Sequence, residues 1–286
     1  MPSPLRLGIM ALGAAAGAGG VGNMAYRASV SAPEMNMPQL VSNAALPWYV
    51  ALKVRNPGIG VELCGGVLVA RNVVLTAAHC VASAVDSPAN VRAFQGDGPL
   101  DALTAVLATR IATHPAWHEP GKVDAALVFL SQELAGGRPL KLRAVADVPA
   151  PADALLSGRG QMTNNVFAPS VGFAKLQVIE WQGCRGDWPE LVTPSTICSI
   201  DTINGSCHGD SGGPLVMGTF QDAQLIGIVL GGPDLCGQKS RAGRFATVFT
   251  RSSAIADFVR RELPGLEVTT TAAPGPLFTP PKTNEI

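Results

Sequence analysis

The stretch GDSGGP at residues 209–214 places Ser211 between an aspartate and two glycines. A serine hydroxyl becomes a nucleophile only when a base removes its proton, and it needs hydrogen-bond donors aimed at the oxyanion that forms on attack. Gly209 permits a tight turn that brings the N–H groups of Gly209 and Ser211 to one point, and the flanking glycines keep the surface open. The alternative is a plain glycine-rich turn between strands, which this combination of residues disfavours.

Two further stretches offer the partners that such a serine needs. LTAAHC at residues 75–80 places His79 after a β-run and beside Cys80, where a lone histidine is more often structural. VDAALV at residues 123–128 opens an apolar run with Asp124. A carboxylate is costly to bury without a partner, and a histidine ring N–H is a suitable one. Such an aspartate would hold the tautomer of the ring and stabilise the imidazolium.

Together the three stretches resemble those of chymotrypsin/trypsin-like serine proteases. The chain order His79, Asp124, Ser211 is that of this family and not that of subtilisins or α/β-hydrolases. The resemblance runs from about residue 47 to residue 259. It implies a serine-type endopeptidase, a hydrolase that forms an acyl-enzyme intermediate on Ser211 and acts on protein or peptide substrates. The N–H groups of Gly209 and Ser211 would form the oxyanion hole.

Short β-runs separated by Gly, Pro and Asp predict an all-β fold. The runs lie at residues 48–54, 67–69, 73–75, 103–111, 125–130, 173–180, 213–217, 225–230 and 245–250. The resemblance implies two six-stranded antiparallel β-barrels of the chymotrypsin type, roughly at residues 47–145 and 155–250, with a polar linker near 145–155.

The protease domain is expected to span residues 47–263 and to end in a helix at 252–263. Ser252 or Ser253 can cap this helix, and the Pro-Gly pair at 264–265 stops it. Residues 264–286, rich in Thr and Pro, are expected to form a disordered tail.

The N-terminal run predicts export. Arg6 precedes an uncharged stretch at residues 7–26, which suggests a cleaved signal peptide over residues 1–26. An uncleaved anchor is the alternative, because about 20 uncharged residues can span a bilayer; a plain disordered leader is a third. Residues 27–46 would be a propeptide or leader. We therefore expect a secreted, extracellular or periplasmic monomer that contacts a membrane only if the run is uncleaved.

The net charge and the cysteine content of the chain agree with a secreted protein. The 286 residues carry 21 basic and 21 acidic side chains, so nothing indicates a nucleic-acid partner. An even number of cysteines without a C-x-x-C pair favours disulfides over a metal, although six cysteines leave 15 connectivities open. The family resemblance implies no cofactor, no metal, and the pairs Cys64–Cys80, Cys184–Cys198 and Cys207–Cys236.

The family resemblance also implies a substrate pocket. Gly205 stands where trypsin-like members carry an aspartate, so we expect cleavage after uncharged or apolar residues rather than after Lys or Arg. Arg244 is expected to point to solvent. The full set of residues assigned to substrate binding is Gly205, Ser206, His208, Leu230, Gly231, Gly232 and Gly243.

Activation is the feature least like the family. Family zymogens are cut before an Ile-Val-Gly-Gly sequence, and the new amine pairs with the aspartate beside the serine, here Asp210. The best local match, LVSN from Leu40, is poor. Either cleavage occurs before Leu40 or the protein matures without this step. A non-catalytic binding protein on a protease fold therefore stays open as an alternative, and an esterase using the same nucleophile as a third.

Overall fold

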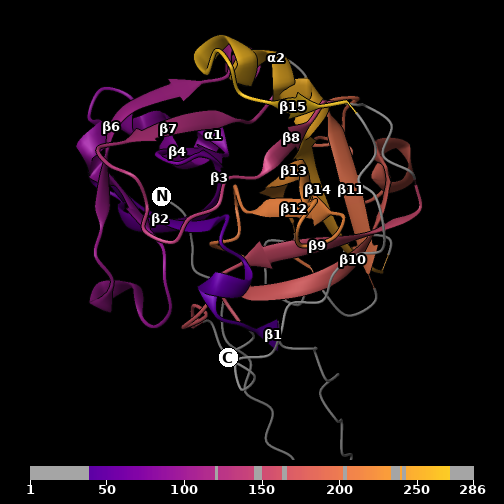
Figure 1. Ribbon diagram of the computed structural model, residues 1–286. Helices are drawn as coiled ribbons and strands as arrows, with labels where there is room; N and C mark the ends of the chain where they lie inside the picture. The colour runs from indigo at the N-terminus through magenta and orange to yellow at the C-terminus, as the bar shows by residue number, and fades with distance from the viewer. Residues whose placement is uncertain are drawn as a thin grey trace, which may run out of the picture. The chain divides into compact units, whose positions relative to one another are not determined.

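The computed structural model describes residues 39–119, 122–144, 150–162, 166–201, 205–232, 239 and 243–270. These residues form two β-barrels that lie side by side (Figure 1). The first barrel is closed in the order β2-β3-β4-β7-β6-β5. Its strands are β2 (Tyr49–Asn56), β3 (Gly60–Ala70), β4 (Val73–Thr76), β5 (Val91–Phe94), β6 (Val106–Thr113) and β7 (Ala126–Leu130).

The second barrel follows the order β12-β9-β10-β11-β14-β13, and the pairing of β12 with β13 closes it. All neighbouring strands in both rings are antiparallel, so the predicted fold class is confirmed. The strands are β9 (Ala152–Gly158), β10 (Gly172–Glu180), β11 (Thr196–Asp201), β12 (Pro214–Met217), β13 (Gln224–Gly231) and β14 (Phe245–Arg251).

Alternation along β2 shows why these sequences form barrels. Side chains alternate across a strand. Val50 and Leu52 belong to the apolar cluster inside the first barrel, whereas Tyr49 and Ala51 belong to a second cluster. That second cluster also contains Ile228 of the other barrel. One strand therefore fills its own barrel and packs it against its neighbour.

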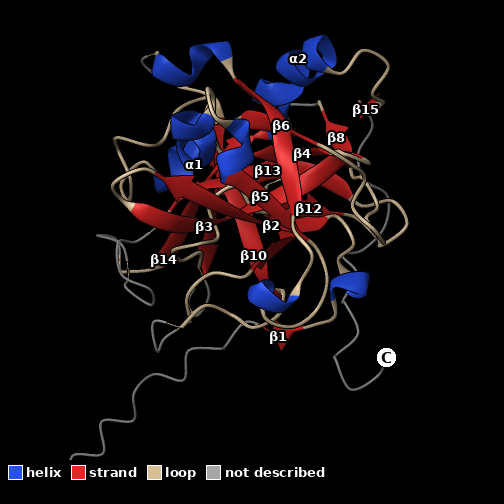
Figure 2. Cartoon of the chain, turned by 90° about the vertical axis from the view of Figure 1, so that its left-hand side faces the viewer, coloured by secondary structure: helices blue, strands red, loops and turns tan. Residues whose placement is uncertain are grey.

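Helices are few and lie at the periphery, while strands fill the centre (Figure 2). Helix α1 (Ala78–Val81) follows β4, and α2 (Ser252–Glu262) occupies the predicted position of the C-terminal helix. Ile255 and Phe258 of α2 are buried in the cluster shared by the two barrels. Short 3-10 helices lie at Asn43–Ala45, Ala82–Ala84, Pro88–Asn90, Leu100–Ala102, Pro115–His118 and Trp181–Cys184.

The structure departs from the expected ends of the domain. Strand β1 (Gln39–Leu40) pairs with β10, and Val41 and Leu46 are fully buried, so the packed chain begins before residue 47. The expected disordered tail contains β15 (Val268–Thr269), which pairs in parallel with β8 (Lys141–Arg143). β8 pairs in turn with β13. Apolar contact and strand pairing thus extend the domain at both ends.

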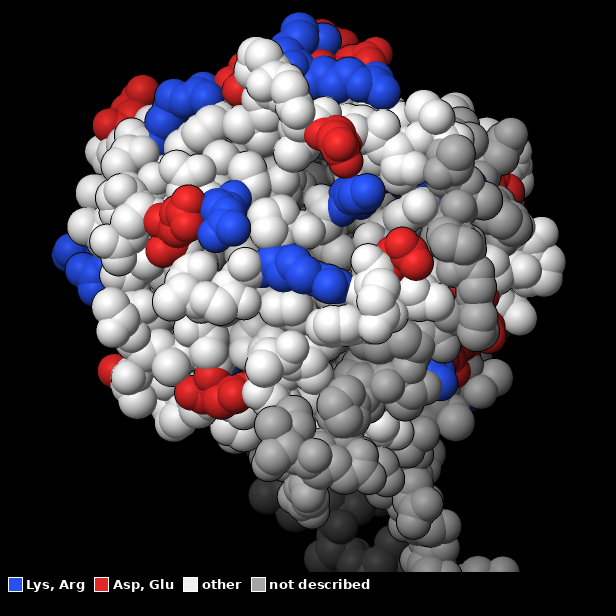
Figure 3. Space-filling model, in the orientation of Figure 1, with Lys and Arg blue, Asp and Glu red and all other residues white. Residues whose placement is uncertain are grey.

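The predicted signal or anchor lies outside the described residues. Among the residues that are described, no helix has the length and apolar character needed to cross a membrane. On the face seen in Figure 3, basic and acidic side chains are interspersed rather than gathered by sign. This distribution matches the balanced net charge of the chain.

Candidate active site

His79 and Asp124 form a close pair. His79 lies on α1, and Asp124 directly precedes the apolar run that forms β7. Nδ1 of His79 is 2.6 Å from Oδ2 of Asp124, and the backbone N–H of His79 donates to Oδ1 at 2.9 Å. The Asp124 side chain is fully buried, whereas the His79 side chain is 37% exposed. The carboxylate therefore holds an imidazole that remains open to solvent.

Ser211 reaches the same place from the second barrel. Its carbonyl accepts a hydrogen bond from the N–H of Gly65 on β3 at 2.8 Å. Sγ of Cys80 lies 3.8 Å from the Ser211 carbonyl oxygen and 3.6 Å from Nε2 of His79. The Thr250 hydroxyl, also from the second barrel, donates to the Asp124 carbonyl at 3.1 Å. The structure thus brings the three predicted catalytic residues together where the barrels meet.

Gly212 makes this approach possible. Its φ is +79°, and a side chain there would collide with the Thr76 hydroxyl oxygen of β4. The backbones of Gly65 and Gly213 also pack against each other. A Cβ at Gly65 would lie only 2.8 Å from the Cα of Gly213. Only glycines let the segment after Ser211 pack directly on the first barrel.

The turn before Ser211 presents two backbone donors. Gly209 has a φ of +93°, a conformation that favours glycine, and the N–H of Asp210 closes the turn on the Cys207 carbonyl at 3.0 Å. Within the described residues, the N–H groups of Gly209 and Ser211 donate to no acceptor. Two unused donors beside a serine hydroxyl are the arrangement that an oxyanion hole requires.

Asp210 points away from this turn into the protein. Its Oδ1 accepts from the N–H of Gly160 at 2.8 Å, and its Oδ2 accepts from the N–H of Cys207 at 2.9 Å. A Cβ at Gly158 or at Gly160 would overlap the carboxylate, so the group is enclosed although the residue as a whole is half-buried. Burial raises the pKa of Asp210 to about 6, and the two backbone hydrogen bonds oppose that rise.

No described Lys, Arg or His forms an ion pair with Asp210. Leu40, the candidate first residue after activation, pairs with Gly172 of β10, and Gly172 pairs with Gly158 of β9. Leu40 is therefore about 10 Å from Gly158, or two strand spacings. An amine at Leu40 could reach Asp210 only if β1 left the sheet.

Three of the predicted pocket residues, Gly205, Ser206 and Gly232, lie close to one another and to Thr247. The N–H of Ser206 donates to Oγ1 of Thr247 at 2.9 Å, and the two hydroxyl oxygens are 3.2 Å apart. A Cβ at Gly232 would lie 2.6 Å from the Ser206 hydroxyl, and one at Gly205 would contact Phe245 at 3.5 Å. Thr247 was not predicted, because nothing in the sequence marks it as a partner of Ser206.

An exposed aromatic side chain that the sequence did not indicate lies beside the turn before Ser211. The Phe167 ring lies against Gly209, where a Cβ would be 2.8 Å from its Cε1, and the ring is partly exposed. The carbonyl of His208 accepts from the N–H of Gln161 at 2.8 Å, which ties the exposed His208 to the same segment.

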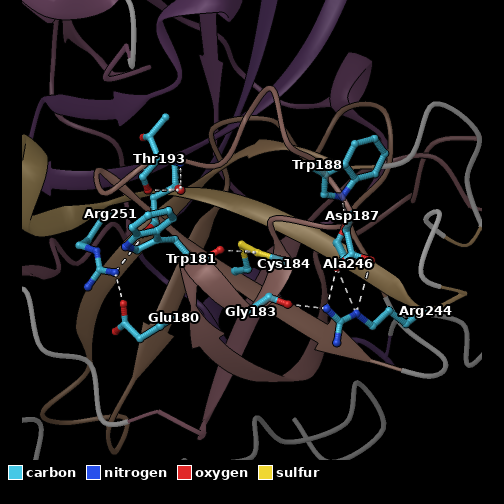
Figure 4. Close-up of a disulfide and its surroundings, with 12 residues drawn as sticks. Glu180, Trp181, Gly183, Cys184, Asp187, Trp188, Thr193, Arg244, Ala246 and Arg251 are labelled. Carbon is cyan, nitrogen blue, oxygen red and sulfur yellow. Dashed lines mark hydrogen bonds and ion pairs between the residues drawn. A yellow bond between two sulfur atoms is a disulfide. The ribbon is translucent and has the colours of Figure 1, made fainter.

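Arg244 does not point to solvent, and that expectation was wrong. Figure 4 shows its guanidinium directed at Asp187. Nε and Nη2 lie 3.1 Å and 2.7 Å from Oδ2 of Asp187, whose side chain is fully buried, and Nη2 also donates to the Gly183 carbonyl at 2.6 Å. This pair links the residue after Gly243, which the sequence assigned to substrate binding, to the loop that carries the Cys184–Cys198 disulfide.

Two of the three predicted disulfides are present, Cys64–Cys80 and Cys184–Cys198. Cys207 is also disulfide-bonded, but Cys236 lies outside the described residues, so that pairing stays a prediction. The group formed by Cys64, His79 and Cys80 is compact enough to hold a metal ion. Its two cysteines share a disulfide and have no thiolate to offer.

Comparisons with known proteins agree with this fold. The family model described as Trypsin matches residues 39–259. Human chymotrypsin-like elastase family member 3B is 28% identical over 76% of this chain and 84% of its own length. Human kallikrein-8 is 29% identical over 75% of this chain and 81% of its own length.

Among solved structures, the scabies mite inactivated protease paralogue S-I1 matches with a TM-score of 0.66. It is 24% identical, and the match covers 79% of this chain and 99% of that one. The paralogue S-D1 has the same TM-score at 19% identity, with coverage of 82% and 99%. These likenesses concern the fold.

Proposed function

This chain belongs to the Trypsin family, the chymotrypsin/trypsin-like serine proteases, and on that premise we propose that it is an active serine endopeptidase. The observation that carries the proposal is the pair of N–H groups at Gly209 and Ser211 that donate to no described residue, in a segment that packs beside a His–Asp pair. A binding protein would have no need of donors left free at the nucleophile.

Each residue then has a role in the reaction. His79 accepts the Ser211 hydroxyl proton as the oxygen attacks the substrate carbonyl, and Asp124 stabilises the resulting imidazolium. The oxyanion accepts hydrogen bonds from the N–H groups of Gly209 and Ser211. His79 then donates its proton to the leaving amine, which produces an acyl-enzyme. Water activated by the same imidazole hydrolyses that ester and restores the serine.

We assign the preference before the cleaved bond to uncharged or apolar side chains. The described partner of Ser206 is the hydroxyl of Thr247 and not a carboxylate, so a Lys or Arg side chain bound there would lack a charged partner. Substrate backbone would pair with the strand end at Leu230–Gly232, and His208 would lie at the mouth. Peptides that differ only at this residue measure the preference directly.

We further propose that the protein is secreted. Two disulfides in the described domain support an oxidising compartment, where such bonds persist. The N-terminal sequence of the secreted protein tests both the signal peptide and the cleavage point. It also shows whether Leu40 ever becomes a free amine.

The main experiment compares the purified mature protein with its Ser211→Ala variant on casein. Loss of the triad nucleophile lowers turnover by about 10⁶-fold. An unchanged thermal midpoint shows that the variant is folded, and labelling by a fluorophosphonate identifies Ser211 as the reactive group. Equal cleavage by both proteins would contradict the proposal.

A catalytically silent binding protein is the second candidate. The absence of a cation partner for Asp210 among the described residues favours it, because a buried, unpaired carboxylate can distort the adjacent turn. A folded, matured protein that neither cleaves casein nor reacts with the fluorophosphonate would support this candidate over the enzyme.

A further inference from the structure

The first barrel has a basic hollow on its outer face, outside the catalytic and pocket residues named above. Its volume is about 480 Å³, and it is formed by β2, β3, β5 and the short helix before β5. The described residues that line it include no acidic one; they are Lys53, Arg55, Val61, Ala89, Asn90 and Arg92. A local excess of positive charge is notable in a chain whose net charge is zero.

The strand register concentrates this charge. Lys53 and Arg55 are two residues apart on β2 and so lie on one face, and Lys53 is directly opposite Arg92 on β5. Like charges directly opposite each other destabilise a sheet. An ion pair with Asp101 offsets this repulsion at Lys53. The side chains of Arg55 and Arg92 form no ion pair or hydrogen bond with any described residue, so two guanidinium groups remain available.

Exposed apolar side chains border the basic groups. Val61 is opposite Arg55 on β3 and is 64% exposed, and Ile59, in the turn that joins β2 to β3, is 77% exposed. A small inorganic anion would use the arginines but not these side chains. We propose that the hollow is a secondary binding site for an acidic protein segment that also carries an apolar side chain. Its carboxylates pair with Arg55 and Arg92, and its apolar side chain packs on Ile59 and Val61.

The hollow is placed to act together with the active site. Val61 and Gly65 are four residues apart on β3, or about 13 Å. The N–H of Gly65 donates to the Ser211 carbonyl. One polypeptide can therefore occupy both places. The assignment of the acidic segment to a substrate rests on the proposed endopeptidase activity, whereas binding at the hollow does not.

The binding test uses the full chain carrying Ser211→Ala, so that nothing is cut. Fluorescence polarisation measures the affinity of a short labelled peptide rich in Glu around a central Leu. We expect the change Arg55→Gln with Arg92→Gln to weaken binding about tenfold, since each exposed charge pair contributes up to about 1 kcal/mol. Val61→Ser should also weaken it. Arg71→Gln is the matched control, because Arg71 is an exposed arginine already paired with Glu133.

Three results would contradict the proposed binding site. The first is that the parent and the double variant bind the peptide with equal affinity. The second is that a peptide with Gln in place of Glu binds as well as the Glu peptide, and the third is that a sulfated polysaccharide binds while the peptide does not. The substrate link is tested separately with active protein. The double variant should lower kcat/KM about tenfold for a long substrate with an acidic segment and leave a short substrate unchanged. Equal loss on both substrates contradicts the link, and absence of all turnover contradicts only the proposed activity.

Discussion

Asp124 and Asp210 are both enclosed beside Ser211, but their partners differ. Asp124 accepts from the ring and the backbone N–H of His79, a side chain that can carry a positive charge. Among the described residues, Asp210 accepts from the backbone N–H groups of Gly160 and Cys207 and from no side chain. The first carboxylate orients a base that must move protons. The second holds a segment of backbone in place.

The difference shows in the protonation of Asp210. Without a described cation beside it, burial raises its pKa to about 6. Asp187 is a third case for comparison. Its side chain is fully buried, as that of Asp124 is, and its partner Arg244 carries a permanent positive charge. Substitutions at these carboxylates and at the residues around them separate the role of a charged partner from that of backbone donors.

The largest effect is expected for Asp124→Asn. The neutral amide keeps the shape of the carboxylate but no longer stabilises the imidazolium or the required tautomer of His79. A triad without this charge loses about 10⁴-fold in kcat. Peptide hydrolysis measures the loss, and Asp257→Asn, at an exposed ion pair with Arg260, is the control. A loss below tenfold would mean that His79 does not depend on Asp124.

Gly160→Ala tests the role of the backbone N–H donors that hold Asp210. The added methyl group would overlap the Asp210 carboxylate and push it from its two N–H donors. The turn at Gly209 should then shift, and removing an oxyanion donor lowers kcat by about 10²–10³-fold. Gly186→Ala is the matched control, because a Cβ at Gly186 contacts nothing. Full activity of Gly160→Ala would show that Asp210 does not set the turn.

The pH dependence of stability should report Asp210 in the intact chain. Its pKa is about 6 in the folded chain and 3.8 in an ordinary environment, so the folded state binds the proton more tightly. This contribution favours folding below pH 3.8 and is lost as the pH rises through about 6. Denaturant unfolding of Asp210→Asn should show a pH dependence flatter by on the order of 3 kcal/mol. Parallel curves for the two proteins would mean that a cation already neutralises Asp210.

The smallest effect is expected for Arg244→Ala. The change removes the guanidinium that faces the buried Asp187 carboxylate, and the 32% exposure of Arg244 moderates the cost to about 2 kcal/mol of unfolding free energy. KM should rise more than kcat falls, because the pair supports the pocket wall and not the nucleophile. Arg71→Ala, at an exposed pair, should cost less than about 1 kcal/mol. A fall in kcat alone would contradict this division.

Local motifs predicted the catalytic residues, and contacts between distant segments explain what was missed. His79, Asp124 and Ser211 each stand in a stretch whose composition is unusual by itself. Arg244 was placed in solvent because its partner Asp187 is 57 residues away in sequence.

The strands that were missed have a similar cause. β5, β9 and β11 were not among the predicted β-runs. β5 pairs with β2 and β6, β9 pairs with β10, and β11 pairs with β14, so each depends on register across its barrel. The enclosure of Asp210 by Gly158 and Gly160 joins segments 50 residues apart, and no local pattern marks it. Periodicity identifies single elements, whereas these contacts exist only after the elements assemble.

The end of the described chain connects both barrels. Glu262 of α2 pairs with Arg110 of the first barrel, the Ser252 hydroxyl donates to the carbonyl of Arg143 on β8, and β15 then pairs with β8. Because a chain is synthesised from its N-terminus, these contacts are the last to become available. His79 and Ser211 have both left the ribosome by then. The contacts of α2 and β15 with the two barrels can therefore form only after both of these residues have emerged.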